Sequence, residues 1–107
     1  MFRTTTTALS AALLLAASTL TARAYSGEIL VTCRLNPQGD NFLALRNCGS
    51  TRCAMLAKLG PDSFMLTLEP YAIKGWRQVI VLDGPQDQTL DGPAGWVYEE
   101  YACPTAY

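Results

Sequence analysis

Residues 76–82 have the sequence Trp76-Arg-Gln-Val-Ile-Val-Leu82, and this stretch decides the fold. It is rich in β-branched residues and holds neither glycine nor proline, which predicts a strand. Successive side chains of a strand face opposite sides of a sheet. We therefore expect two sets of residues on opposite faces: Trp76, Gln78, Ile80 and Leu82 on one, and Arg77, Val79 and Val81 on the other.

Similar short runs lie on both sides of this strand, and turn-forming residues separate them. Four of the runs are typical of strands, namely residues 28–33, 42–46, 63–69 and 95–98. The connection Asp83–Ala94 is long and contains Asp-Gly-Pro twice, so it is expected to be a loop. Five or six short strands with turns between them predict a single all-β domain, a small sandwich or barrel.

One run, Cys53–Leu59, is ambiguous because its residues favour a helix by propensity. It is short, however, and it ends at the turn signal Gly60-Pro61-Asp62, so a strand is favoured. In that strand Met55, Ala57 and Leu59 would share one face. By the same alternation, Glu99 and Glu100 would face opposite sides of a closing strand.

The first 24 residues are typical of a cleavable signal peptide. A basic start, Met1-Phe-Arg3, precedes an apolar segment of about 13 residues, Ala8–Leu20, and a small-residue cleavage site, Ala22-Arg-Ala24. A retained membrane anchor is the alternative, but the segment is shorter than the roughly 20 residues that span a bilayer. We expect a mature domain of residues 25–107 in the periplasm or outside the cell, with no membrane span after cleavage.

The expected mature domain is mildly acidic. Without Arg3 and Arg23 it keeps six basic and nine acidic residues, a net charge of about −3, and the chain has no histidine. Binding to nucleic acid or to anionic lipid depends on clustered Lys and Arg, and no such cluster is present in the sequence. Nucleic acid is therefore not an expected partner.

The four cysteines are expected to form two disulfides, because an even number in a short exported chain is typical of a disulfide framework. Sequence alone leaves three pairings open. We favour Cys33 with Cys103, which would join the start of the domain to its end, and Cys48 with Cys53, which would fix a turn. A zinc site or a redox-active pair is disfavoured by the cysteine spacing.

The order of these features resembles the bacterial SH3-like domain family, a small β-barrel of exported and cell-wall-associated proteins. The resemblance covers about Ile29–Cys103 and rests on six segments: Phe42-Leu-Ala-Leu-Arg46, the Asn47–Arg52 loop, Met55-Leu-Ala-Lys-Leu-Gly60, Phe64-Met-Leu-Thr-Leu68, Gly75-Trp-Arg-Gln-Val79 and Gly95-Trp-Val-Tyr98. It implies a barrel of five to six strands and a monomeric, non-catalytic binding module without a cofactor. The added cysteines and the long 83–94 connection depart from the family pattern.

Residue chemistry also disfavours an enzyme, since the chain has no histidine and its cysteines are expected to be oxidised. Asp83, Asp87 and Asp91 offer oxygen ligands for calcium, but without EF-hand spacing they are better interpreted as a solvated loop. No metal site is expected.

The aromatic residues are the candidates for ligand binding. Tyr71, Tyr98 and Tyr101 combine apolar area with a polar tip and suit an exposed binding face, although partial burial is an equal alternative. Trp76 is a further candidate, but in so small a domain Trp76 and Trp96 are more often core residues. Two functions remain: binding of peptidoglycan or its stem peptides, or binding of an exported protein, as an inhibitor or immunity protein would.

Overall fold

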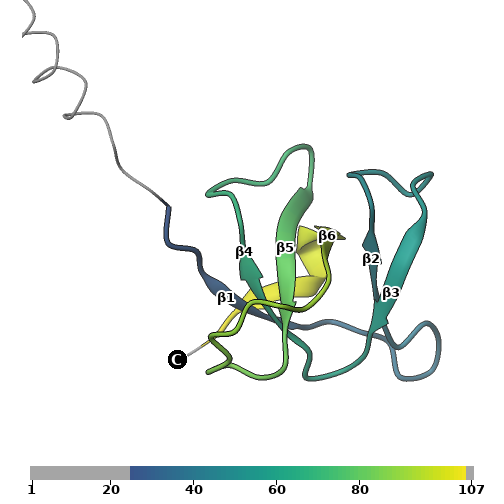
Figure 1. Cartoon of the computed structure of the whole chain (residues 1–107). Coiled ribbons are helices and arrows are strands. Elements are labelled where there is room, and N and C mark those ends of the chain that lie inside the picture. Colours follow the sequence, from purple (N-terminus) through teal and green to yellow (C-terminus); the bar gives the residue numbers. More distant parts are fainter. Residues whose placement is uncertain (1–24, 106–107) are drawn as a thin grey trace, which may run out of the picture.

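The computed structural model describes residues 25–105, so the predicted signal peptide at 1–24 lies outside the described residues. The described part is all-β, with seven strands and one short 3₁₀ turn (Figure 1). These elements are β1 (Ile29–Thr32), β2 (Leu43–Arg46), β3 (Met55–Leu59), β4 (Phe64–Thr67), β5 (Trp76–Leu82), β6 (Ala94–Tyr98), η1 (Glu99–Tyr101) and β7 (Ala102–Pro104).

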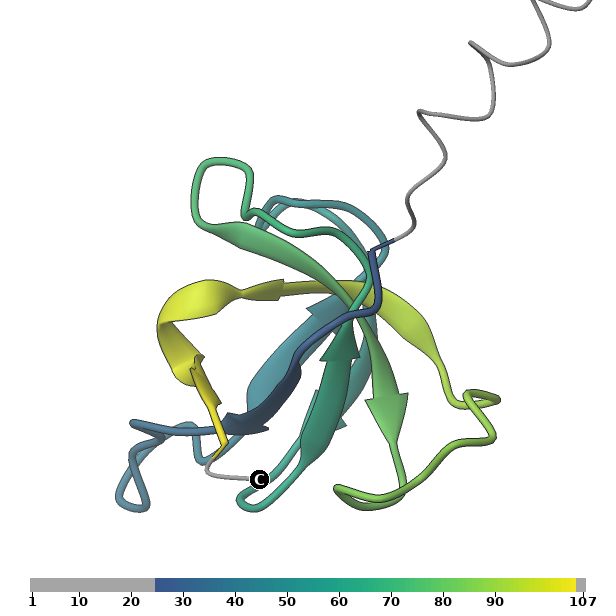
Figure 2. The ribbon, with the colours of Figure 1, turned by 90° about the vertical axis from the view of Figure 1, so that its left-hand side faces the viewer.

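All seven strands belong to one antiparallel sheet with the order β3-β2-β6-β5-β4-β1-β7. The last strand returns to the first, so β7 lies beside β1 (Figure 2). Among the described residues no ladder joins the two outer strands, β3 and β7, so the sheet is not closed into the expected barrel. It has one more strand than the upper number expected from the sequence.

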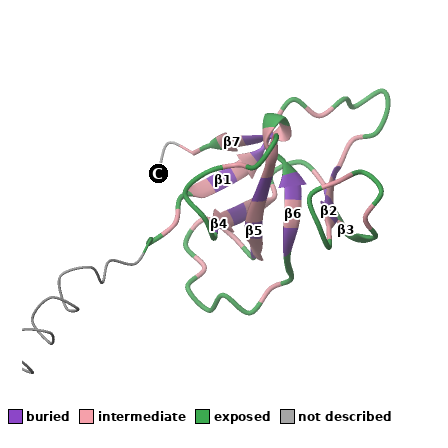
Figure 3. Cartoon of the chain, turned by 90° about the horizontal axis from the view of Figure 1, so that it is seen from above, coloured by how far each residue is buried: buried purple, intermediate pink, exposed green. Residues whose placement is uncertain are grey.

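The sheet surrounds one hydrophobic core. Every strand contributes to this core, and Figure 3 shows the buried segments distributed over the whole sheet. The fully or almost fully buried members are Leu30, Leu43, Leu45, Leu59, Met65, Val79, Val97 and Ala102. Because one cluster contacts all seven strands, the sheet has an inner face that is filled by the core and an outer face that is free for other contacts.

The alternation predicted for β5, the longest strand, is confirmed for most of its residues. Arg77 and Val79 are buried in β5, and Val81 packs against the core, while Trp76 lies half-buried on the other side. Leu82 is an exception, since it is buried at the end of the strand. The expected partition of β5 into two faces therefore holds up to the end of the strand.

Two local expectations are wrong. Glu99 and Glu100 do not face opposite sides of a strand, because they form the 3₁₀ turn η1 that redirects the chain from β6 into β7. In β3, Met55 does not share a face with Ala57. The register of β2 and β3 shifts by one residue, from Leu45 opposite Ala57 to Arg46 opposite Met55. This β-bulge turns Met55 to the outer face, where its side chain is 42% exposed.

The two disulfides have the favoured pairing. Cys33 pairs with Cys103, with a Cα–Cα distance of 5.9 Å, and this bond fastens the edge strand β7 to the end of β1. A loop of this length corresponds to about 4 kcal/mol of stabilisation in the chain-entropy model. Cys48 pairs with Cys53 across the β2–β3 connection, for which the same model gives about 2 kcal/mol.

Arg77 is a buried cation that joins three separate segments. It is 7% exposed, and its guanidinium donates to a carboxylate oxygen of Glu99 at 2.7 Å. It also donates to the backbone carbonyls of Glu69 at 3.1 Å and Pro70 at 3.1 Å, and to the hydroxyl of Tyr25 at 3.4 Å. The side chain thus ties the β4–β5 loop and η1 to the start of the described chain.

Replacement of Arg77 by Met is expected to lower the free energy of unfolding by about 1 to 3 kcal/mol, because the hydrogen bonds of this buried side chain to Glu69, Pro70 and Glu99 are lost. The control Glu99→Gln keeps an acceptor beside the guanidinium and should cost less, since the Glu99 side chain is 41% exposed. Urea unfolding followed by circular dichroism measures both values. Equal stability of R77M and the unchanged protein would contradict this role.

Candidate ligand groove

The aromatic side chains at the start of β5 and the end of β6 lie together on the outer face of the sheet. Trp76 is paired with Tyr98 in the ladder, and their rings meet edge to face with centroids 5.3 Å apart. Tyr101 follows from η1, with its ring centroid 6.3 Å from that of Tyr98. Edge-to-face contacts stabilise aromatic pairs in fixed orientations. The three rings therefore form one continuous aromatic wall.

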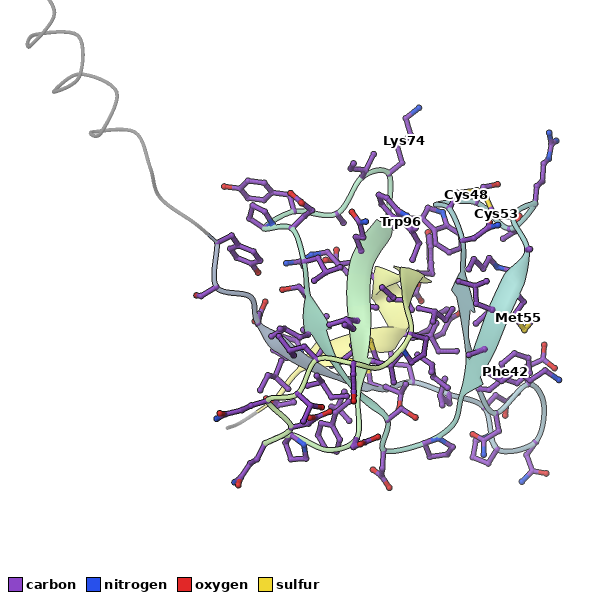
Figure 4. All side chains as sticks on the ribbon, in the orientation of Figure 1. Phe42, Cys48, Cys53, Met55, Lys74 and Trp96 are labelled. Atoms are coloured by element: carbon purple, nitrogen blue, oxygen red, sulfur yellow. A yellow bond between two sulfur atoms is a disulfide. The ribbon has the colours of Figure 1, made fainter. Side chains whose placement is uncertain are left out.

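The Cys48–Cys53 loop covers one end of this wall. A Cβ built on Gly49 would lie 3.1 Å from the Cβ of Trp76 and 3.3 Å from Cε3 of Trp96. The loop backbone thus rests directly on both indole side chains, and a larger residue at position 49 would displace them. Figure 4 shows Trp96 between β5 and the β2–β3 hairpin, close to the Cys48–Cys53 disulfide.

Strand β2 lies close to β6 because β6 has a glycine, Gly95, where the two strands meet. A Cβ on Gly95 would lie 2.6 Å from the carbonyl oxygen of Arg46, so no other residue fits without a shift. The approach places Arg46 opposite Trp96 in the ladder. The guanidinium of Arg46 donates to the carbonyl of Cys53 at 3.0 Å and so also holds the disulfide loop.

Between these parts lies an open groove with a volume of about 560 Å³. Its aromatic wall is Trp76, Tyr98 and Tyr101, and its other lining residues come from the β1–β2 connection, β2, the β2–β3 loop and the start of β3. Outside the aromatic wall the groove is lined by Arg34, Leu35, Asn36, Asp40, Phe42, Leu43, Ala44, Arg46, Thr51 and Met55. A concave site with apolar walls and a few polar groups is the usual form of a ligand site.

Of the four predicted ligand residues, the groove brings three together. Trp76, Tyr98 and Tyr101 line it, whereas Tyr71 does not. Tyr71 is 80% exposed in the β4–β5 loop, beside the exposed Ile73. The favoured interpretation of the two tryptophans as core residues is wrong, because both are half-buried on the outer face and neither belongs to the core cluster.

The sequence did not single out Arg34, Arg46 or Met55 as groove residues. The alternation of β2, in which Leu43 and Leu45 face the core, does predict an outward Arg46. The outward turn of Met55 depends on the bulge, which no local pattern indicates. Arg34 reaches the groove from a left-handed backbone conformation, with φ 58°, just after β1.

The 83–94 loop is ordered by its own carboxylates. Asp87 accepts hydrogen bonds from the backbone N–H of Asp83 at 2.9 Å and from the backbone N–H and hydroxyl of Thr89 at 2.9 and 2.7 Å. The Thr89 hydroxyl also contacts a carboxylate oxygen of Asp91 at 3.0 Å. In residues 25–105 no group of three or more candidate ligand side chains is placed to hold a metal ion, including these aspartates.

Comparison of the chain with known protein families, with curated proteins and with solved structures finds no match. Over the described range, no helix is long and apolar enough to cross a membrane.

The 83–94 loop is expected to loosen in acid. The Asp83 N–H, and then the Thr89 hydroxyl and N–H, lower the pKa of Asp87 below its usual value of 3.8. A lowered pKa in the folded state means that the carboxylate stabilises the loop above the usual pKa, and that this contribution is lost as the pH falls through the lowered value.

Nuclear magnetic resonance (NMR) titration from about pH 6 to about pH 3 measures this through the amide shifts of Asp83 and Thr89. Both are expected to move below the usual pKa of Asp87 as their hydrogen bonds to this carboxylate are lost, and Asp87→Asn should remove this part of the movement. Amide shifts in the unchanged protein that stay constant, or that move at higher pH, would contradict the assignment.

Proposed function

We propose that this chain is an exported, non-catalytic binding module of the bacterial SH3-like family that holds a cell-wall peptide in the groove beside Trp76, Tyr98 and Tyr101. The observation that carries the proposal is the continuous wall of Trp76, Tyr98 and Tyr101 along an open groove. Aromatic walls of this kind offer rigid apolar area together with hydroxyl and indole donors, which suits the alternating apolar and polar groups of a peptide.

The shape of the groove also favours an extended ligand. Its walls come from β2, β3, β5, β6, η1 and two loops, so a bound chain would contact residues distant in sequence. The disulfide loop and the tight contact of Gly49 with the indoles hold one wall in place before a ligand arrives. A preformed site loses little conformational entropy on binding, which favours affinity for a small ligand.

Export and family membership have separate support. Two disulfides in so small a domain are typical of an oxidising compartment outside the cytosol. The four longer extended segments behind the family resemblance coincide with β2, β3, β4 and β5, and the fifth coincides with β6. The step from family to ligand is an analogy, so the groove and not the fold carries the function.

Replacement of Tyr98 by Ala is expected to weaken binding of soluble muropeptides, released from purified peptidoglycan, by about tenfold or more, because the middle of the aromatic wall is removed. The matched control is Tyr71→Ala, which removes an equally large ring outside the groove and should leave the dissociation constant unchanged. Isothermal titration calorimetry measures both values.

The result that would reject the proposal is the absence of muropeptide binding by the unchanged protein. Equal weakening by Y98A and Y71A would place the ligand elsewhere on the surface and would also reject the groove. Circular dichroism of each variant verifies that the fold is retained.

The second candidate function is binding of a protein partner, and the hydrogen bonds within the 83–94 loop favour this function. The Asp87 hydrogen bonds hold a protruding loop in one conformation and present Leu90, which is 46% exposed with φ 53°. An inhibitor or immunity protein would use such a rigid loop against an exported enzyme. Shortening the loop should then abolish a complex captured from the periplasm, while muropeptide binding would stay unchanged.

A further inference from the structure

The positive charge of this acidic domain gathers around the groove. Residues 25–105 hold six basic and nine acidic side chains. Of the six basic residues, Arg34 and Arg46 line the groove, and Lys58 lies 4.9 Å above the ring of Phe42, itself a lining residue. Of the nine acidic residues, Asp40 alone lines it. The local charge is thus opposite in sign to that of the whole domain.

Each groove arginine is oriented by the protein but only partly used by it. Arg34 donates from Nη1 to the carbonyl of Glu100 at 2.7 Å, and the same nitrogen lies beside the sulfurs of the Cys33–Cys103 disulfide. Arg46 donates from Nη1 to the carbonyl of Cys53. In the described part of the chain, Nε and Nη2 of both side chains have no acceptor, so each guanidinium keeps free donors.

Arg77 shows what a structural arginine looks like in the same molecule. Its Nε, Nη1 and Nη2 all have acceptors. Among residues 25–105, the ion pair between Arg77 and Glu99 is the only one. Arg34 and Arg46 have no carboxylate within ion-pair distance in that range. Two oriented guanidiniums without a protein carboxylate are suited to receive carboxylates from outside, which they bind as charge-assisted, bidentate partners.

We propose that the groove selects a peptide that carries free carboxylates, and that Arg34 and Arg46 bind these carboxylates while the aromatic wall covers the chain beside them. This inference rests on the proposed function and adds the chemical class of the ligand, an anionic wall peptide. Asp40 is the opposing charge, so its removal should strengthen binding of such a ligand.

The experiment compares two forms of one probe. Muropeptides from purified peptidoglycan are used as isolated, and a second portion has its carboxylates converted chemically to primary amides. Calorimetric titration of the unchanged protein is expected to give a dissociation constant about tenfold or more higher for the amidated form, because the charged partner of each guanidinium is gone.

Three substitutions locate the effect. Arg34→Gln and Arg46→Gln should each weaken binding of the unmodified muropeptides about fivefold or more, and Asp40→Asn should strengthen it. Lys74→Gln removes the same charge from the tip of the β4–β5 loop, which Figure 4 shows far from Phe42 and Met55, and should leave binding unchanged. Because Arg46 also holds the disulfide loop, the exposed Arg34 provides an independent test if R46Q does not fold.

The possible failures are distinct. Equal binding of both muropeptide forms by the unchanged protein would overturn the carboxylate inference and leave the proposed function in place. Absence of binding to either form would overturn both. Tighter binding of a synthetic Glu-containing peptide without wall chemistry would overturn the assignment to a wall peptide, and equal weakening by R34Q and K74Q would overturn the role of the groove arginines.

Discussion

Alternation of side chains across a sheet that surrounds one small core is the constraint on which the rest of this structure depends. Since all seven strands contribute to that core, alternate residues face the inside along most strands, and the bulged β3 departs from this rule by turning Met55 outward. The intervening residues are then available for another task. On β5 and β6 these are Trp76, Trp96 and Tyr98, and on β2 they include Arg46. The alternation thus places Trp76, Tyr98 and Arg46 at the groove, which the core residue Leu43 also lines.

Three local features turn this outer face into a defined site. Gly95 allows β2 to lie close to β6, the bulge in β3 turns Met55 outward, and the Cys48–Cys53 loop rests on the two indoles through Gly49. Each feature changes the placement of a few side chains, and Gly95 also lies against the core residue Leu45. Cross-links supply part of the stability of so small a domain. Local features of its loops and strands can therefore shape the groove while the order of the strands stays the same.

Strand positions and the presence of two disulfides were predictable from the sequence because they depend on short patterns and an even cysteine count, whereas sequence alone left three cysteine pairings open. Apolar or β-branched runs between turn residues mark β1, β2, β4 and β5, and the even cysteine count indicates two disulfides. Trp76 and Tyr98 lie together for the same reason, since both follow the alternation, whereas Tyr101 joins them from the turn η1, which the sequence did not predict. The groove as a whole was not predictable, because the pairing of β2 with β6 and the approach of Arg34 depend on contacts between residues far apart in the chain.

Intermolecular nuclear Overhauser effects between the protein and a bound muropeptide test ligand binding in the groove most directly. Binding there predicts effects from ligand protons to the rings of Trp76 and Tyr98 and to the side chain of Met55, all of which line the groove. Effects confined to Tyr71 and Ile73 in the β4–β5 loop, or to Leu90 in the 83–94 loop, would contradict it.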